Sequence, residues 1–144
     1  LKAVLSMDDT GMVVDNFALK PQFLLIYEIP WESQIGLQPD AFLFEPGITP
    51  TYIFGSDTNF PVTLAVPMRV GLGNKFYDGN DYGFFSVGPE FTVPISGLSS
   101  KTIKTYASIG YTYINLGPTT TDFILNGDGS SNKHVYNFGL TTTF

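Results

Sequence analysis

Three charged side chains, Glu45, Arg69 and Glu90, each lie on the polar side of a segment whose other side is apolar. If those segments are consecutive antiparallel strands, a turn at Asp57 puts Glu45 opposite Arg69. A second turn, centred between positions 79 and 80, puts Glu90 opposite Arg69, because register follows from residue pattern and turn position. This carboxylate–guanidinium–carboxylate row could act as a polar filter for solutes inside a barrel. It could instead be an ion-pair network that only satisfies the charges of a packed interior.

Enzyme chemistry is not expected. His134 is the single histidine, and no recognisable nucleophile motif accompanies it. Residues 78–81 (Asp-Gly-Asn-Asp) and 126–129 (Asn-Gly-Asp-Gly) carry oxygen atoms that calcium could use. They lack EF-hand spacing, however, and their residue types are typical of tight turns. The absence of cysteine excludes disulfides and zinc–thiolate sites. We therefore predict no catalytic residue, no metal and no cofactor.

The composition favours strands that lie between two environments. The 144 residues are enough for a single domain. They include 13 Phe, 8 Tyr, one Trp and 15 Gly, and only 14% are charged, which suits closely packed strands with an aromatic girdle. The net charge of −6 and the lack of a basic patch argue against nucleic acid as a partner. No run approaches the roughly 18 apolar residues of a transmembrane helix.

A period of two is the main structural signal. In residues 60–72 every second residue is apolar, while the alternate residues are Pro, Thr, Ala, Arg and Gly. The same pattern predicts strands over 22–31, 42–54, 85–95, 103–116 and 134–144. Segment 60–72 exceeds the usual strand of about five or six residues and reaches the roughly nine to eleven that a tilted transmembrane strand needs. Residues 1–21 are less regular, with weaker strands expected at 1–7 and 13–19.

The predicted connections alternate in length. Residues 55–59 and 96–102 form short turns, and 32–40, 74–82 and 117–133 form longer loops. Short periplasmic turns and long outer loops are typical of outer-membrane barrels. Pro67 and Pro89 fall inside predicted strands, where a proline removes a ladder hydrogen bond, so we predict a β-bulge at each.

The closing segment carries a family resemblance. Its alternate residues run Tyr136, Phe138, Leu140, Thr142 and Phe144. It resembles the C-terminal assembly signal of bacterial outer-membrane β-barrels, with Asn137, Gly139 and the final Phe144, and departs from it at Thr142, where a second aromatic is usual. From Gln22 onward the chain resembles the C-terminal half of porin-like outer-membrane proteins. The stretch FPVTLAVPMRVGLGNKFYDGNDYGFFSVGPEFTVPIS and the closing strand carry this resemblance.

Pattern and resemblance together predict an all-β fold, an antiparallel up-and-down transmembrane β-barrel of eight or more strands. Residues 1–144 form one domain, with regular barrel strands over 22–144. Five clear strands and two or three weaker ones compare with the even number, at least eight, of a single-chain bacterial barrel, so we expect that an N-terminal portion of the barrel is absent from this sequence. The competing interpretation is a compact eight-stranded barrel that just fits the length. The chain opens at Leu1 without a Met, either as a processed mature form or as a start inside a longer protein.

Two sets of residues have predicted roles in such a barrel. The lumen-lining set is Glu45, Arg69, Glu90, Thr49, Thr51, Thr63 and Thr92. The set predicted to form girdles at the two lipid–water interfaces is Trp31, Tyr52, Phe54, Phe60, Phe76, Tyr77, Tyr82, Phe84 and Phe85.

The resemblance implies a location in the bacterial outer membrane and passive diffusion of small polar solutes. The expected partners are the lipid bilayer and either further copies of the chain or other proteins of an envelope assembly. Two alternatives stay open. One is a plugged barrel with a structural or interaction role. The other is a soluble β-sandwich or jelly roll that acts as a binding module and hides the apolar faces in a core.

Overall fold

The computed structural model describes residues 1–12, 14–27, 41–77, 80–99, 102–118 and 130–143, and the chain in these parts is almost entirely β-structure. The strands are β1 (Lys2–Ser6), β2 (Phe17–Ala18), β3 (Gln22–Tyr27), β4 (Phe42–Ile48), β5 (Thr51–Phe54), β6 (Val62–Ala65), β7 (Met68–Tyr77), β8 (Asn80–Val87), β9 (Glu90–Pro94), β10 (Lys104–Leu116) and β11 (Asn132–Thr143). One turn of 3-10 helix, η1 (Ser96–Leu98), follows β9. The predicted all-β class is confirmed.

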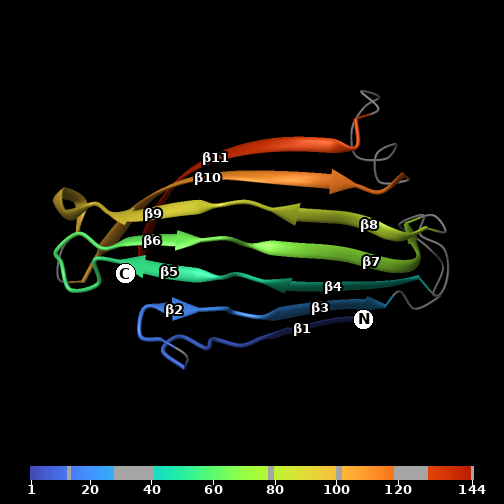
Figure 1. Cartoon of the computed structure of the whole chain (residues 1–144), viewed down its shortest axis with the longest axis horizontal. Coiled ribbons are helices and arrows are strands. Elements are labelled where there is room, and N and C mark those ends of the chain that lie inside the picture. Colours follow the sequence, from blue (N-terminus) through green and yellow to red (C-terminus); the bar gives the residue numbers. More distant parts are fainter. Residues whose placement is uncertain (13, 28–40, 78–79, 100–101, 119–129, 144) are drawn as a thin grey trace.

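All strands belong to one 11-stranded antiparallel sheet, with hydrogen-bonded order β1-β3-β4-β7-β8-β10-β9-β6-β5-β2 and β11 paired with β10. This order describes an up-and-down meander of long strands, several of which are split in two (Figure 1). The pairs β2 and β3, β4 and β5, β6 and β7, and β8 and β9 are the halves of these long strands. β10 and β11 run without a break and give the sheet its longest ladder.

Prolines cause the breaks, and they lie side by side across the sheet. The Val66 amide donates to the Pro50 carbonyl at 2.8 Å, and the Tyr111 amide donates to the Pro89 carbonyl at 2.9 Å. Between these two bonds, the Gly88 amide donates to the Pro67 carbonyl at 3.3 Å. A proline has no N–H with which to return such a bond. We call this set of positions the proline line.

The predicted bulges at Pro67 and Pro89 are wrong, because the register is the same on both sides of the proline line. Thr51 pairs with Ala65 on one side and Ile48 pairs with Met68 on the other, with no extra residue between them. The register shifts occur elsewhere, at the end of β4 and around Leu72 in β7. The missing amide therefore interrupts the ladder without inserting a residue.

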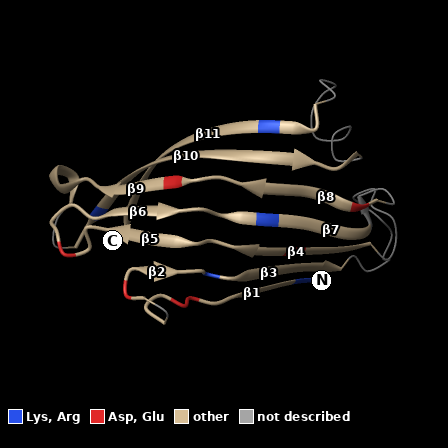
Figure 2. Cartoon of the chain, viewed as in Figure 1, with Lys and Arg blue, Asp and Glu red and all other residues tan. Residues whose placement is uncertain are grey.

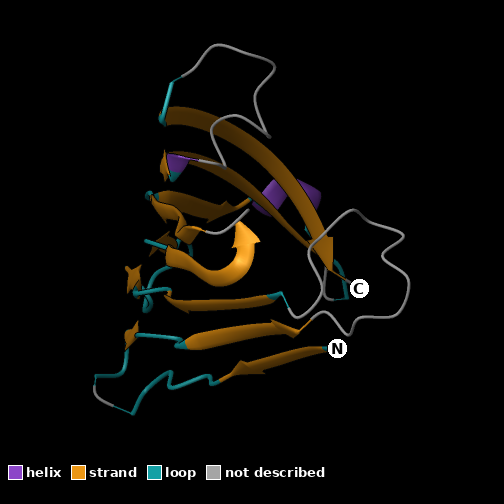
Figure 3. Cartoon of the chain, turned by 90° about the vertical axis from the view of Figure 1, so that its right-hand side faces the viewer, coloured by secondary structure: helices purple, strands orange, loops and turns teal. Residues whose placement is uncertain are grey.

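The sheet is curved but not closed, so the predicted closed barrel is not formed by the described residues (Figure 3). β1 bonds only to β3, and β11 bonds only to β10. The two edge strands also run in the same direction. β1 starts at one end of the long strands, and β11 finishes at the opposite end (Figure 1). Direct pairing of β1 with β11 would therefore be parallel, whereas the described strands of this sheet pair antiparallel throughout.

One predicted long loop is also wrong. Residues 74–82 were expected to form an outer loop, but β7 continues to Tyr77 and β8 starts at Asn80, and these two residues pair. The predicted short turn after β5 is present. Of the turn predicted at 96–102, residues 96–98 form η1, and positions 100–101 lie outside the described residues. The loop predicted at 32–40 lies outside the described residues, as does most of the one predicted at 117–133.

The first connection is fixed by a buried carboxylate. Asp9 is only 6% exposed, and one of its oxygens accepts from the Leu19 amide at 2.9 Å and from the Lys20 amide at 2.8 Å. Lys20 has a φ of 47°, a left-handed conformation that costs energy in a residue other than glycine. The amide of Lys20 lowers the pKa of Asp9 below its usual range. The carboxylate thus stabilises an otherwise unfavourable turn before β3.

The described residues contain no conventional hydrophobic core. The buried apolar side chains are Ala18, Ala41, Leu43 and Leu116, and no large side chain among them is fully buried. A β-sandwich needs a second sheet packed about 10 Å away, and the described strands form a single sheet. The apolar residues of this chain must therefore lie at the surface.

Candidate functional site

Two rows of paired residues define the two faces of the sheet. One row runs through Phe17, Tyr52, Leu64, Phe91, Ile109 and Phe138. The neighbouring row runs through Ile53, Thr63, Thr92, Ser108 and Gly139. We call the first the outer face and the second the inner face. The outer face is apolar, whereas the inner face is mostly small and polar.

The apolar outer face is the more exposed of the two. Phe91 is 43% exposed, Ile109 53% and Phe138 79%. In β3 every outer-face residue is exposed, while every inner-face residue is half-buried. A protein folded in water shows the opposite order, because large apolar side chains leave the solvent first. The outer face therefore needs a cover that the described residues do not provide.

Strand charges gather on the inner face. By register, Lys2, Glu45, Arg69, Glu90, Lys104 and Lys133 all fall on it. Figure 2 shows how few charged positions the strands carry and how they are spread over β7, β9 and β11. Charge and exposed apolar surface are thus separated onto opposite faces of one sheet.

Arg69 and Glu45 form the ion pair at the centre of the candidate site. Arg69 Nη1 lies 3.5 Å from Glu45 Oε1. The Arg69 side chain is 48% exposed and the Glu45 side chain 15%. The two are diagonal neighbours rather than direct partners, because Arg69 pairs with Gly47. A Cβ on Gly47 would lie 3.2 Å from Arg69 Cγ, so the glycine leaves room for the arginine stem.

The predicted three-charge row is only partly correct. Arg69 faces Ser86 in β8, whereas Glu90 faces Ala65 in β6. Of the charged groups in the described residues, Glu45 is the one that makes an ion pair with Arg69. The prediction placed all three on one face, which is right, but the register differs because the pairing of β7 with β8 shifts around Leu72.

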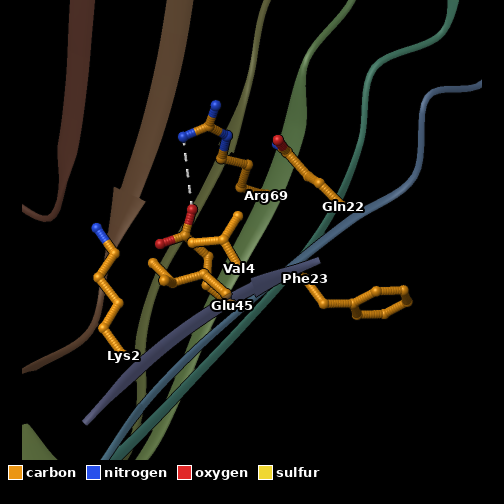
Figure 4. A pocket seen from close by; sticks show the side chains of 7 residues that line it. Lys2, Val4, Gln22, Phe23, Glu45 and Arg69 are labelled. Carbon is orange, nitrogen blue, oxygen red and sulfur yellow. Dashed lines mark ion pairs between the residues drawn. The ribbon is translucent and has the colours of Figure 1, made fainter. Parts of the chain in front are cut away.

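A shallow hollow of about 140 Å³ surrounds this ion pair on the inner face. Lys2, Val4, Gln22, Phe23, Leu24, Glu45 and Arg69 line it. Figure 4 shows that Lys2, Glu45 and Arg69 project to one side of the sheet, while Phe23 projects to the other. Gly47 opens space here as well, since a Cβ would lie 3.1 Å from Gln22 Nε2. Four strands, β1, β3, β4 and β7, thus contribute to one polar cluster.

The predicted lumen threonines all fall on the inner face. Thr63 pairs with Thr92, and Thr51 pairs with Ala65. Thr51 is buried, and its hydroxyl donates to the Thr49 carbonyl at 2.9 Å. These residues make the inner face beyond the proline line weakly polar, and the charges that the described strands carry there are Glu90 and, at the end of the sheet, Lys104.

The predicted girdle residues divide into two groups. Tyr52, Phe54 and Phe60 are exposed near the short turns, and Tyr52 and Phe54 pack edge to face with ring centroids 4.7 Å apart. At the other end, Phe85 lies on the outer face with Val70. The predicted girdle role of Phe84 is wrong. Phe84 pairs with Gly71 and Leu116 on the inner face, so it cannot belong to an outward girdle.

The remaining girdle and assembly residues are placed as follows. The Tyr82 hydroxyl donates to Asn115 Oδ1 at 2.7 Å. Trp31 and Phe144 lie outside the described residues, as do the side chains of Phe76 and Tyr77. Asn137 and Gly139 pair with Gly110 and Ser108 on the inner face. A Cβ on Gly110 would lie 2.6 Å from Asn137 Oδ1, so the asparagine side chain packs over that glycine.

A cluster of aromatic and polar side chains on the outer face of β10 and β11 was not predicted. The Tyr111 hydroxyl lies 2.7 Å from His134 Nδ1, and the Tyr113 hydroxyl donates to Asn132 Oδ1 at 2.6 Å. The ring of Tyr111 also packs against Tyr136, with centroids 5.3 Å apart. The signal was available, because Tyr111 and Tyr113 alternate in one segment and His134 and Tyr136 alternate in another. The inter-strand register was needed to bring them together.

The described residues show neither a metal-binding cluster nor a membrane-spanning helix. Within the described ranges, no group of three or more His, Asp or Glu side chains could hold a metal ion. Also within those ranges, no helix has the length and hydropathy needed to cross a membrane. Residues 78–81 and 126–129 carry the oxygen atoms that calcium could use, but positions 78–79 and 126–129 lie outside the described residues.

Comparisons with known proteins found no similarity. No protein-family model, no curated protein and no solved structure matches the chain. The described residues form an all-β chain with one open, antiparallel, up-and-down sheet, and this fold class is the basis for the function proposed below.

Proposed function

We propose that the chain is part of a porin-like β-barrel of a bacterial outer membrane, through which small polar solutes diffuse. The observation that carries this proposal is the inverted distribution of side chains. The outer face exposes Phe91, Ile109 and Phe138, while the inner face holds the strand charges. Lipid covers the apolar face of a membrane barrel, and polar groups line its interior.

The apolar surface crosses the strands at an angle, which supports a location in a membrane. The row Ile48, Met68 and Val87 is apolar, but it continues into Tyr113 and His134 in β10 and β11. In β4 the apolar run starts at Phe42, before this row, whereas in β11 it starts at Tyr136, after it. The shift is about 2 residues per strand, or about 6.6 Å along for each 4.8 Å across.

This shift corresponds to strands inclined by about 55° to the apolar band, somewhat more than the roughly 35–45° tilt of transmembrane barrel strands. A horizontal lipid layer around tilted strands would produce it. In the same arrangement, Tyr111, Tyr113, Tyr136 and His134 would lie at the lipid–water boundary, where tyrosine rings with polar tips are favoured.

Closure of the barrel belongs to this proposal. β1 and β11 run in the same direction (Figure 1). An entirely antiparallel barrel therefore takes an odd number of further strands between these two edges, which gives the even total found in single-chain bacterial barrels.

An open path is favoured over a plugged barrel. The inner-face row Thr63, Thr92, Ser108 and Gly139 consists of small residues.

A matched pair of substitutions tests the membrane setting. Phe91→Lys puts a charge on the outer face, and Thr92→Lys puts the same charge on the inner face of the same strand. After refolding into lipid vesicles, the folded fraction is read from the difference in gel mobility between unheated and boiled samples. Phe91→Lys should reduce it strongly, because a lysine near the bilayer midplane costs about 2–4 kcal/mol. Thr92→Lys should remain close to wild type.

The opposite result is equally clear. In a soluble protein, replacing an exposed Phe91 with lysine changes stability by no more than about 0.5 kcal/mol and improves solubility. A protein that stays soluble in plain buffer, shows equal mobility before and after boiling and tolerates Phe91→Lys would overturn the proposal in favour of a soluble β protein.

A further inference from the structure

The inner face and the chain as a whole carry charge of opposite sign. On the inner face the described strands carry the cations Lys2, Arg69, Lys104 and Lys133 and the carboxylates Glu45 and Glu90. Because the whole chain has a net charge of −6, the acidic excess lies in the remaining residues. The wall of the proposed pore is thus cationic, although the protein is acidic.

The cationic character is concentrated at the hollow around Arg69. Glu45 lies between Arg69 and the side of the hollow that Lys2 lines (Figure 4). One carboxylate can neutralise one of these two cations, so the cluster retains a positive charge. Glu90, the other inner-face carboxylate, is directed to a different part of the sheet because it pairs with Ala65.

The geometry leaves the arginine able to bind a second anion. One nitrogen, Nη1, faces Glu45, and the side chain is 48% exposed. A guanidinium has five donors in a planar fork, so the groups not used by Glu45 can still bind a carboxylate or phosphate oxygen. The Gln22 amide lies beside it, in the space that Gly47 leaves open. All the polar groups of the hollow except Glu45 can donate hydrogen bonds.

We propose that the Lys2–Gln22–Arg69 cluster is the selectivity site of the pore and that it favours small oxyanions, carboxylates and phosphates, over cations. This inference rests on the proposed pore. The acidic excess of the chain as a whole acts against it, but at about 0.1 M salt such charges are screened beyond about 10 Å. Arg69 acts on a solute in direct contact and is not screened in this way.

The test is the reversal potential of the protein in a planar bilayer under a potassium chloride gradient, repeated with potassium acetate. The wild type should pass chloride and acetate in preference to potassium. Arg69→Gln should lower the anion-to-cation permeability ratio about 30-fold, because removing one unit charge about 4 Å from a passing ion in water disfavours the anion about fivefold and favours the cation about fivefold. Glu45→Gln should raise the ratio, since it leaves Arg69 uncompensated.

Lys104→Gln is the matched control, because it removes the same charge from the inner face at the far end of the sheet and should change the ratio little. Unchanged gel mobility of unheated samples shows that each variant folds. A conducting wild type that prefers potassium, or an Arg69→Gln variant equal to Lys104→Gln, overturns the selectivity site and leaves the pore intact. A folded wild type without any conductance overturns the pore and this inference with it.

Discussion

Replacing Gly88 by alanine tests how the sheet passes the proline line. Gly88 precedes Pro89, and its amide donates to the Pro67 carbonyl. A Cβ at this position would lie 1.8 Å from the Tyr111 carbonyl oxygen and 2.6 Å from Thr112 Cα. The first distance is about half the 3.4 Å at which ordinary contact begins, and both atoms belong to the backbone of β10. The neighbouring strand would have to move.

The size of the effect follows from what must be displaced. Overpacking a tight site costs about 1–3 kcal/mol. Moving β10 also weakens the bond from the Tyr111 amide to the Pro89 carbonyl, which is 2.9 Å long, and such a bond contributes about 0.5–1.5 kcal/mol. We expect Gly88→Ala to lower the free energy of unfolding by about 2–4 kcal/mol, roughly a 30- to 1000-fold change in the unfolding equilibrium.

The assay is urea unfolding in detergent, followed by the loss of β-sheet circular dichroism. Gly97→Ala is the matched control, because a Cβ on Gly97 meets nothing within 4 Å. It should change stability by less than about 0.5 kcal/mol. Equal stability of the two variants would refute the close approach of β8 and β10 at Gly88, and with it the role assigned to this glycine.

Two further predictions concern hydrogen bonds at the short-turn end. Because the amide of Lys20 lowers the pKa of Asp9 below 3.8, the carboxylate stabilises the fold above that pH, and the contribution is lost as pH falls through the lowered folded-state value. Wild type should thus lose stability in urea titrations below about pH 4 more steeply than Asp9→Asn, and parallel curves would contradict this. Thr105→Val should cost about 0.5–1.5 kcal/mol, since the buried Thr105 hydroxyl donates to the Leu98 carbonyl at 3.0 Å. The exposed control Thr141→Val should be neutral in the same unfolding assay, and an equal loss in both would refute the assignment.

Local pattern determined most of the strands and the face on which each side chain lies. Alternation with a period of two placed Glu45, Arg69 and Glu90 on one face, and the structure confirms that placement. It also predicted β10 and β11 nearly to their observed bounds. The reason is that successive side chains of a strand point to opposite faces whatever the strand pairs with, so the faces can be read from one segment alone.

Register and closure depended on contacts between segments. The pairing of β7 with β8 is shifted from the predicted register, which moves Glu90 away from Arg69. The proline line depends on four strands meeting at the same level, and no single segment shows that. Whether β1 and β11 can pair depends on the direction of strands at opposite ends of the chain (Figure 1). Amino-acid types thus determined which side of the sheet each residue occupies. The tertiary structure alone decided which residues meet there, because the register between two strands depends on the geometry of the turns that connect them.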